Sequence, residues 1–147
     1  MQVDFYHLTL APLDRLLPVI ADRVMAGGGR LLIVSGDADQ RAALDRQLWM
    51  VPADSFLPHA QAGEGNDSAQ PVLIAAEVHP TNGARHVALA DGLWRDDALT
   101  FDRAFHFFDG DRIAEARSAW RALADHAGVE RRDWKQNDQG RWEQAAG

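Results

Sequence analysis

Arg30-Leu31-Leu32-Ile33-Val34 is the stretch of sequence that decides the fold. Its continuous apolar run is typical of a strand that is buried on both faces of a parallel sheet. Gly27-Gly28-Gly29 ends a helical pattern just before it, and Ser35-Gly36-Asp37 turns the chain into a second helix just after it. Strands and helices that alternate in this way predict an α/β domain with right-handed crossovers.

The same alternation continues outward in both directions. Residues 12–25 repeat apolar side chains at helical spacing, and Pro18 within them predicts a kink or a helix that begins near Leu17. Further strands are expected over residues 3–8, 71–76, 86–89 and 104–108, a helix over 38–49 and a long loop over 51–70. A last helix is expected to begin after the cap Asp109-Gly110-Asp111, to run to about Ala127 and to end at Gly128. We expect one domain over residues 1–128 and a polar C-terminal extension over 129–147, partly ordered or folded as a lid through Trp134 and Trp142.

Composition excludes several classes of protein. The chain has 147 residues, 46% hydrophobic and 25% charged, which is ordinary for one globular domain. The absence of cysteine excludes disulfide frameworks and thiolate metal sites, and it accords with a reducing compartment. No apolar run approaches the roughly 20 residues that a bilayer crossing needs, and the first ten residues do not resemble a signal peptide. We therefore expect a cytoplasmic protein that does not enter a membrane.

Charge is distributed unevenly along the chain. Residues 1–111 hold 8 arginines and 16 acidic residues, a net charge of −8, whereas residues 112–147 hold 7 basic and 6 acidic residues, a net charge of +1. The overall charge of −7 argues against sequence-independent binding of nucleic acid, which requires many cations to neutralise phosphates. A locally basic end on an acidic protein indicates an acidic partner instead.

Motifs for catalysis or for cofactor binding are weak. The three glycines at 27–29 close a helix, whereas glycines that cradle phosphate open one. Ser35-Gly36-Asp37 lies between strand and helix, but it has one glycine, no following lysine, and aspartates that would repel a phosphate. The six histidines show no spacing typical of a zinc protease, and no Gly-x-Ser-x-Gly motif occurs. These features favour a binding module without cofactor, metal ion or catalytic residues; the alternative is a small α/β enzyme or nucleotide-binding domain that uses the turn at 35–37 or the His59/Glu64 loop.

Two segments are candidates for contacts with partners. The first combines Trp49 at the end of a helix with a proline-stiffened loop that carries Phe56, and it provides aromatic anchors either for an interface or for the loop itself. The second is the helix over 112–127, where Arg117 and Arg121 flank Trp120. Two guanidinium groups beside an aromatic edge suit a terminal carboxylate and acidic side chains. The alternative is a solvated helix face on which both arginines pair with neighbouring acids.

One string of residues has the character of a family signature. It consists of Leu48-Trp49, Pro52-Ala53-Asp54-Ser55-Phe56-Leu57-Pro58-His59, Ala62-Gly63-Glu64-Gly65, Pro71-Val72 and Ile74. This string resembles the central signature of the chi subunit family of bacterial DNA polymerase III holoenzyme. The Phe5-Tyr6 strand and the pattern Ala116-Arg117, Trp120-Arg121-Ala122, Ala127-Gly128 are similar too, so the resemblance spans most of residues 3–128.

The resemblance implies a fold and a role. The fold is a Rossmann-like three-layer domain with a mainly parallel sheet and helices on both faces. The role is that of an accessory subunit without an active site, which joins the clamp loader through its psi subunit and binds the acidic C-terminal tail of single-stranded DNA-binding protein. It implies neither sequence-specific binding of nucleic acid nor a membrane partner.

The resemblance also assigns residues to two surfaces. The surface for psi, or alternatively for a helicase of the XPD-like type, is expected at Trp49, Pro52, Phe56, Pro58 and His59. The surface for the tail is expected at Arg117, Trp120 and Arg121, with Arg112 as the candidate for a further upstream cation. The family often has Tyr followed by Lys where this chain has Trp120-Arg121, so the aromatic ring and the positive charge are kept.

Overall fold

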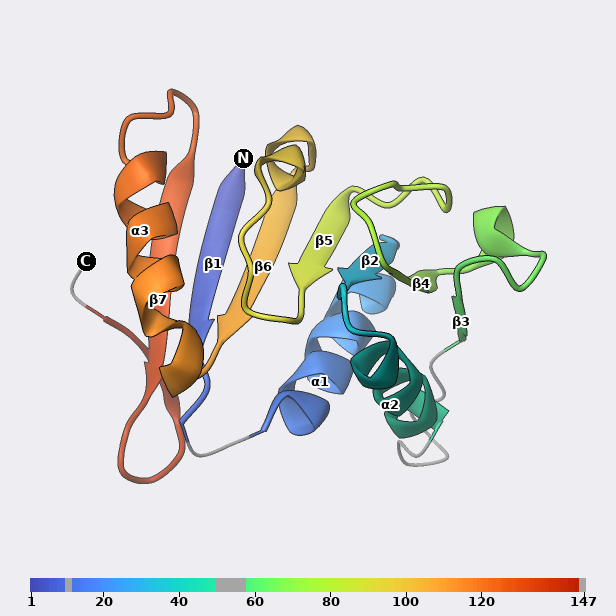
Figure 1. Ribbon diagram of the computed structural model, residues 1–147, viewed down its shortest axis with the longest axis horizontal. Helices are drawn as coiled ribbons and strands as arrows, with labels where there is room; N and C mark the ends of the chain where they lie inside the picture. The colour runs from blue at the N-terminus through green and yellow to red at the C-terminus, as the bar shows by residue number, and fades with distance from the viewer. Residues whose placement is uncertain (10–11, 50–57, 146–147) are drawn as a thin grey trace.

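The computed structural model describes residues 1–9, 12–49 and 58–145, and one sheet of eight strands runs through this part of the chain (Figure 1). The strand order is β3-β4-β2-β5-β6-β1-β7-β8, and of the strand pairs in the described ranges only β7–β8 is antiparallel. The strands are β1 (Gln2–His7), β2 (Leu31–Val34), β3 (His59–Gln61), β4 (Val72–Ala75), β5 (His86–Leu89), β6 (Arg103–Phe108), β7 (Glu130–Gln136) and β8 (Trp142–Gln144). The helices are α1 (Leu13–Ala26), α2 (Ala38–Trp49) and α3 (Ile113–Leu123), with short 3-10 turns η2 (Asp67–Ala69), η3 (Asp96–Thr100) and η4 (Gly110–Arg112). The expected α/β architecture with a mainly parallel sheet is confirmed.

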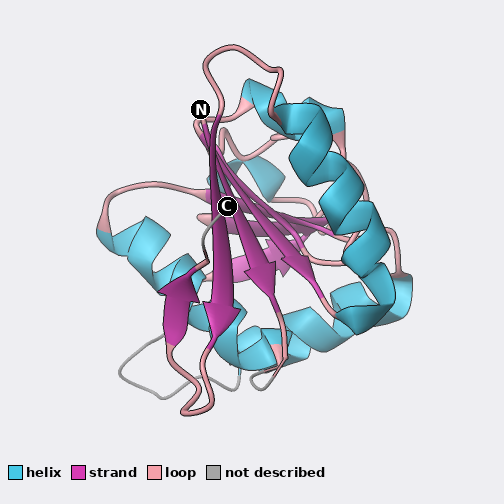
Figure 2. Cartoon of the chain, turned by 90° about the vertical axis from the view of Figure 1, so that its left-hand side faces the viewer, coloured by secondary structure: helices cyan, strands magenta, loops and turns pink. Residues whose placement is uncertain are grey.

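Helices lie on both faces of the sheet (Figure 2). Successive side chains of a strand point to opposite faces, so each buried strand supplies two separate cores. On one face Phe5 and its neighbours pack against Ala116, Ala119 and Leu123 of α3. On the other face Tyr6 and its neighbours pack against α1 and α2. The continuous apolar strands of the sequence are buried on both sides, as their composition predicts.

Helix boundaries differ from the expectations at two places. Helix α1 begins at Leu13 and contains Pro18, so a start near Leu17 is wrong. Pro18 is the sixth residue of the helix, and its ring removes only the backbone hydrogen bond toward Asp14. Helix α3 ends at Leu123 rather than near Ala127. At the other end, the Asp109 side chain accepts a hydrogen bond from the amide of Asp111 and caps the 3-10 turn that precedes α3.

The sheet continues past Gly128. Strand β7 pairs in parallel with β1 over Glu130–Lys135, and β8 pairs with the end of β7. The sequence predicts no strand in this segment, because ERRDWKQ shows neither an apolar run nor a simple alternation. Trp134 and Trp142 pack against Tyr6 on the α1 face, with ring centroids 6.2 and 5.3 Å from that of Tyr6, and not over α3.

The long loop predicted over 51–70 contains more structure than expected. Residues 58–70 include the edge strand β3 and the turn η2, whereas the part of the expected loop at 51–57 lies outside the described residues. Strand β3 has three residues and, among the described strands, pairs with β4 alone. Such a short strand carries too little periodicity to be read from the sequence.

Asp4 is a fully buried carboxylate in the central part of the sheet. Its Oδ2 accepts a hydrogen bond from Nε of Arg103 at 2.7 Å, and its Oδ1 accepts one from Nε1 of Trp134 at 3.0 Å. The side-chain amide of Gln2 donates to the same carboxylate at 3.0–3.1 Å. Since these donors come from β1, β6 and β7, the carboxylate ties three neighbouring strands together.

We expect Asp4→Ala to lower the free energy of unfolding by about 2–4 kcal/mol, because Arg103 and Trp134 lose the buried carboxylate to which they donate hydrogen bonds. Urea denaturation at pH 7 measures this change. The control is Asp102→Ala, which removes the exposed ion pair with Arg85 and should leave the urea midpoint almost unchanged. Equal midpoints for Asp4→Ala and the wild type would contradict the role of Asp4.

His106 is a second buried polar group, enclosed by aromatic rings. Its ring lies edge-on to Phe5 at 5.2 Å and to Trp94 at 5.8 Å, and it stacks near Phe108. Neither ring nitrogen has a hydrogen-bond partner among the described residues. Burial lowers the pKa of His106 from 6.5 to about 4, so the folded protein holds a neutral imidazole at physiological pH.

The depressed pKa of His106 predicts a loss of stability in acid. Between pH 6.5 and about 4 the unfolded chain binds a proton that the folded chain does not, so the free energy of unfolding falls as pH falls through this range. His106→Phe should flatten this dependence by about 3 kcal/mol in total, as measured by urea denaturation at several pH values. The exposed His126 provides the control, since His126→Phe should leave the slope intact. Parallel curves for His106→Phe and the wild type would show that His106 does not contribute.

Candidate functional site

Helix α3 presents Arg117, Trp120 and Arg121 along one side. At 3.6 residues per turn these positions lie within about 100° of one another around the helix axis. Ala116, Ala119 and Leu123 are buried against the sheet, which leaves Arg117 and Arg121 exposed on the flank of the helix. The structure therefore brings these three candidate residues together.

Trp120 is held in place from two sides. Its ring lies edge-on to Phe5 of β1, with ring centroids 5.2 Å apart. On its other side the guanidinium carbon of Arg131 lies 4.2 Å from the ring centroid, and Nη1 of Arg131 donates a hydrogen bond to the Trp120 carbonyl at 2.6 Å. These contacts fix a half-buried indole beside a cation, which is a favourable arrangement for an aromatic edge that contacts a ligand.

Strand β7 adds cations to the same face. Because residues paired in parallel strands point to the same side, Arg131 and Lys135 lie on the α3 side with Val3 and His7. Burial lowers the pKa of His7, and the charges of Lys135 and Arg117 lower it further, which places both cations near this imidazole. Arg117, Arg121, Arg131 and Lys135 around Trp120 are called the α3–β7 basic cluster below.

The exposed arginines of this cluster keep their charge available. Neither Arg117 nor Arg121 forms an ion pair with any residue in the ranges that the structure describes. Glu115, which the sequence offers as a partner for them, pairs instead with Arg112 at 3.3 Å. Among the described residues, two carboxylates act on His7 beside the cluster: Asp133, whose pKa burial raises, and Asp109.

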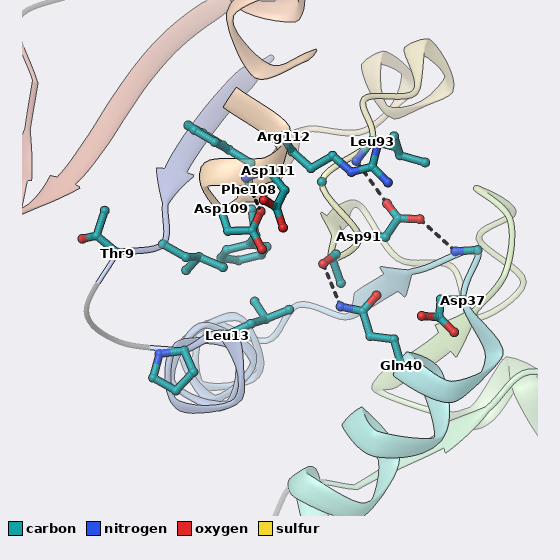
Figure 3. Close-up of a pocket in the computed structure, with 16 residues that line it drawn as sticks. Thr9, Leu13, Asp37, Gln40, Asp91, Leu93, Phe108, Asp109, Asp111 and Arg112 are labelled. Carbon is teal, nitrogen blue, oxygen red and sulfur yellow. Dashed lines mark hydrogen bonds between the residues drawn. The ribbon is translucent and has the colours of Figure 1, made fainter. Parts of the chain in front are cut away.

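Arg112 lies apart from the other candidates. It ends the 3-10 turn η4, directly before α3, so it does not follow the helical spacing of Arg117 and Arg121. Its side chain packs across Gly92, where an added Cβ would meet the Arg112 Cγ at 2.6 Å. Arg112 thus lines the cleft at the carboxyl ends of β1, β5 and β6 (Figure 3) and does not belong to the α3–β7 basic cluster.

The second candidate surface lies at the opposite edge of the sheet. Trp49 ends α2 with 56% of its surface exposed, and its ring lies 4.5 Å from that of His59 in β3. His59 itself is buried, with Nε2 at 2.9 Å from the Asp45 carbonyl oxygen and 3.2 Å from its carboxylate. Pro58 is half-buried beside them. Trp49, Pro58 and His59 therefore lie together, whereas Pro52 and Phe56 lie outside the described residues.

The turn at 35–37 borders a large cleft at the carboxyl ends of the parallel strands, the usual place for ligands in such sheets (Figure 3). The backbone amides at this turn already donate hydrogen bonds to carboxylates: the Gly36 amide donates to Asp91 at 2.9 Å and the Asp39 amide to Asp37 at 2.9 Å. Although burial acts against it, hydrogen bonds from Arg95 and Gly36 lower the pKa of Asp91, which stays ionised. A phosphate would meet carboxylates here instead of free amides.

The loop alternative with His59 and Glu64 meets a similar difficulty. Glu64 accepts a hydrogen bond from the Gln61 amide at 2.9 Å, and His59 is occupied by Asp45. In the described ranges no group of three histidine or acidic side chains is arranged to hold a metal ion. None of the helices in those ranges is both long enough and apolar enough to span a bilayer.

The sequence alone does not place Arg131 and Lys135 in the candidate site. Both stand among the basic residues of the C-terminal part, but their approach to α3 depends on β7, which carries no clear strand pattern. The only earlier signal is the local excess of positive charge after residue 111.

Fold and site together define a Rossmann-like α/β protein with a basic cluster and a half-buried tryptophan on one face. The chain belongs to the DNA polymerase III chi subunit family: the sequence profile described as "DNA polymerase III chi subunit, HolC" matches residues 1–130.

Two curated relatives agree with this assignment. DNA polymerase III subunit chi of Escherichia coli is 36% identical over 81 residues, which cover 55% of each chain. DNA polymerase III subunit chi of Pseudomonas aeruginosa is 31% identical over 84 residues, which cover 55% of this chain and 58% of the relative. The matches span a little more than half of these relatives.

Proposed function

We propose that the protein is an accessory subunit of a bacterial replicase, which links the clamp loader, through psi, to the acidic C-terminal tail of single-stranded DNA-binding protein. The α3–β7 basic cluster is the observation that carries this proposal. Membership of the chi family supports a replication role, and the net charge of −7 favours a protein ligand over DNA. In this proposal the protein makes and breaks no covalent bonds of its own.

The geometry of the basic cluster suits a peptide that ends in a carboxylate. Arg117 and Arg121 offer guanidinium groups that form no ion pair within the described residues, and guanidinium groups bind carboxylates through paired, charge-assisted hydrogen bonds. The Trp120 edge beside them suits an apolar side chain near the end of the tail. Arg131 and Lys135 extend the positive charge from α3 to β7, so several acidic residues can be neutralised together.

The Trp49 surface suits a different partner. An exposed indole next to Pro58 and a fixed histidine supplies apolar contact area that loses little side-chain entropy on binding. We assign psi to this surface, with a helicase of the XPD-like type as the alternative occupant.

Arg121→Glu should weaken binding of the tail by about 1–3 kcal/mol, roughly 5- to 150-fold in Kd, because it removes a charge-assisted contact and adds repulsion. Fluorescence anisotropy with a labelled tail peptide measures the change, and the affinity should also fall with salt. Arg15→Glu on the exposed side of α1 is the matched control. Arg112→Glu should act less strongly than Arg121→Glu, since Arg112 faces another direction. An unchanged Kd for Arg121→Glu would remove this residue from the site.

Trp49→Ala should lower the affinity for psi, or for the helicase, by about 2 kcal/mol or more while leaving binding of the tail intact. The same selectivity is expected of Phe56→Ala. Isothermal titration calorimetry with each partner separates the two effects. Val19→Ala is the control, because Val19 is also an exposed apolar residue but lies on α1. If Trp49→Ala lowered the affinity for both partners equally, Trp49 would have a structural role only.

A further inference from the structure

A small cleft opens on the α1 face of the sheet, close to where β5 and β6 begin. Its volume is about 220 Å³, and its walls come from β1, α1, the glycine turn after α1, β5 and β6. The α3–β7 basic cluster belongs to the other face, because β1 directs Phe5 and His7 toward α3 but Tyr6 toward this cleft. The cleft is therefore a separate feature of the molecule.

The polar groups that line this cleft are basic or neutral. Arg23, Arg103 and His86 line it together with the phenol of Tyr6, and none of its nine lining residues is acidic. Burial and the negative charge of Asp4 raise the pKa of Tyr6, whereas the positive charges of Arg103 and Arg23 lower it, so one carboxylate and two cations act on the hydroxyl. Asp4 offsets one of the two arginine charges, which leaves the cleft a net positive charge in a protein with an excess of seven negative charges.

Arg103 is oriented by Asp4. The buried carboxylate accepts from Nε at 2.7 Å, and the guanidinium carbon lies 4.7 Å from the Phe105 ring centroid. Guanidinium has five donor hydrogens, and the two terminal nitrogens of Arg103 have no partner among the described residues. Asp4 thus fixes the group while its outer edge keeps four donors for a ligand.

Two other lining residues, His86 and Arg23, have polar groups without a partner in the described part of the chain. Nδ1 of His86 is buried and has no hydrogen-bond partner in the described part of the chain. Burial, followed by the charge of Arg103, lowers the pKa of His86, so the ring is neutral at pH 7 and one of its nitrogens carries a proton. The exposed Arg23 forms no ion pair within the described ranges.

We propose that this cleft binds a small organic anion, a carboxylate or phosphate group carried by a compact apolar body. The anionic oxygens would accept hydrogen bonds from the free edge of Arg103 and from Arg23, beside the neutral ring of His86. Ile20, Val24 and Phe105 provide apolar walls for the body. The volume lies below the roughly 300–1,000 Å³ of sites for drug-sized ligands, which favours a ligand smaller than a nucleotide.

Nuclear magnetic resonance of the ¹⁵N-labelled full-length chain tests the proposal. Three probes share a phenyl ring and differ in charge: benzoate, phenyl phosphate and benzylamine. We expect at least one anion to cause saturable shifts of the amide signals of Gly29, His86 and Arg103, and benzylamine to cause none. The anion that binds with the lower Kd shows whether the cleft prefers a carboxylate or a phosphate group. The absence of saturable shifts with both anions, or equal binding of benzylamine, would overturn the proposal.

Two variants examine the residues themselves. Arg23→Glu reverses an exposed charge at the rim, and Arg103→Lys keeps a cation for Asp4 but removes the planar guanidinium edge. Each should raise the Kd of the better anion by about fivefold or more. Arg15→Glu, on the same helix but away from the cleft, should leave that Kd unchanged. Wild-type Kd values for both Arg23→Glu and Arg103→Lys would overturn the site. The affinity of each variant for the labelled tail peptide should equal that of the wild type.

Discussion

The alternation of side chains along β1 is the constraint on which the two faces of the molecule depend. β1 is hydrogen-bonded over its length to β6 on one side and to β7 on the other, so it cannot rotate or shift without breaking both ladders. Phe5 and His7 consequently support Trp120 and the cations around it, while Asp4 and Tyr6 serve the opposite face. A shift of one residue would exchange these two sets and place a carboxylate under α3.

Much of the fold can be predicted from the sequence because its central strands carry their own signal. Leu31–Val34 and Val72–Ala75 are buried on both faces, and burial of that kind demands continuous apolar residues. β7 carries no such signal, because both of its faces hold charged residues: Arg131, Asp133 and Lys135 face α3, and Arg132 shares the other face with Trp134. Its strand conformation comes from pairing with β1, which is a tertiary effect that local patterns do not contain.

The candidate site shows the same division. The spacing of Arg117, Trp120 and Arg121 follows from helical geometry alone, so these residues can be grouped before the fold is known. Arg131 can be added only when β7 is in place, and Arg112 is separated from the group by the geometry of the 3-10 turn that precedes α3. The cleft with Arg23 and Arg103 joins residues 80 positions apart and has no local motif.

The width of the sheet has a consequence for how partners act on one another. β3, beside Trp49, and β7, beside Trp120, are separated by six strand intervals, which amounts to roughly 29 Å at about 4.8 Å per interval. This span exceeds the electrostatic screening length of about 8 Å at physiological ionic strength more than threefold. In the proposed function, charges on ligands at the two surfaces would be screened from each other, so their binding free energies should add. The sheet would then act as a spacer that holds two partners apart without electrostatic coupling between their sites.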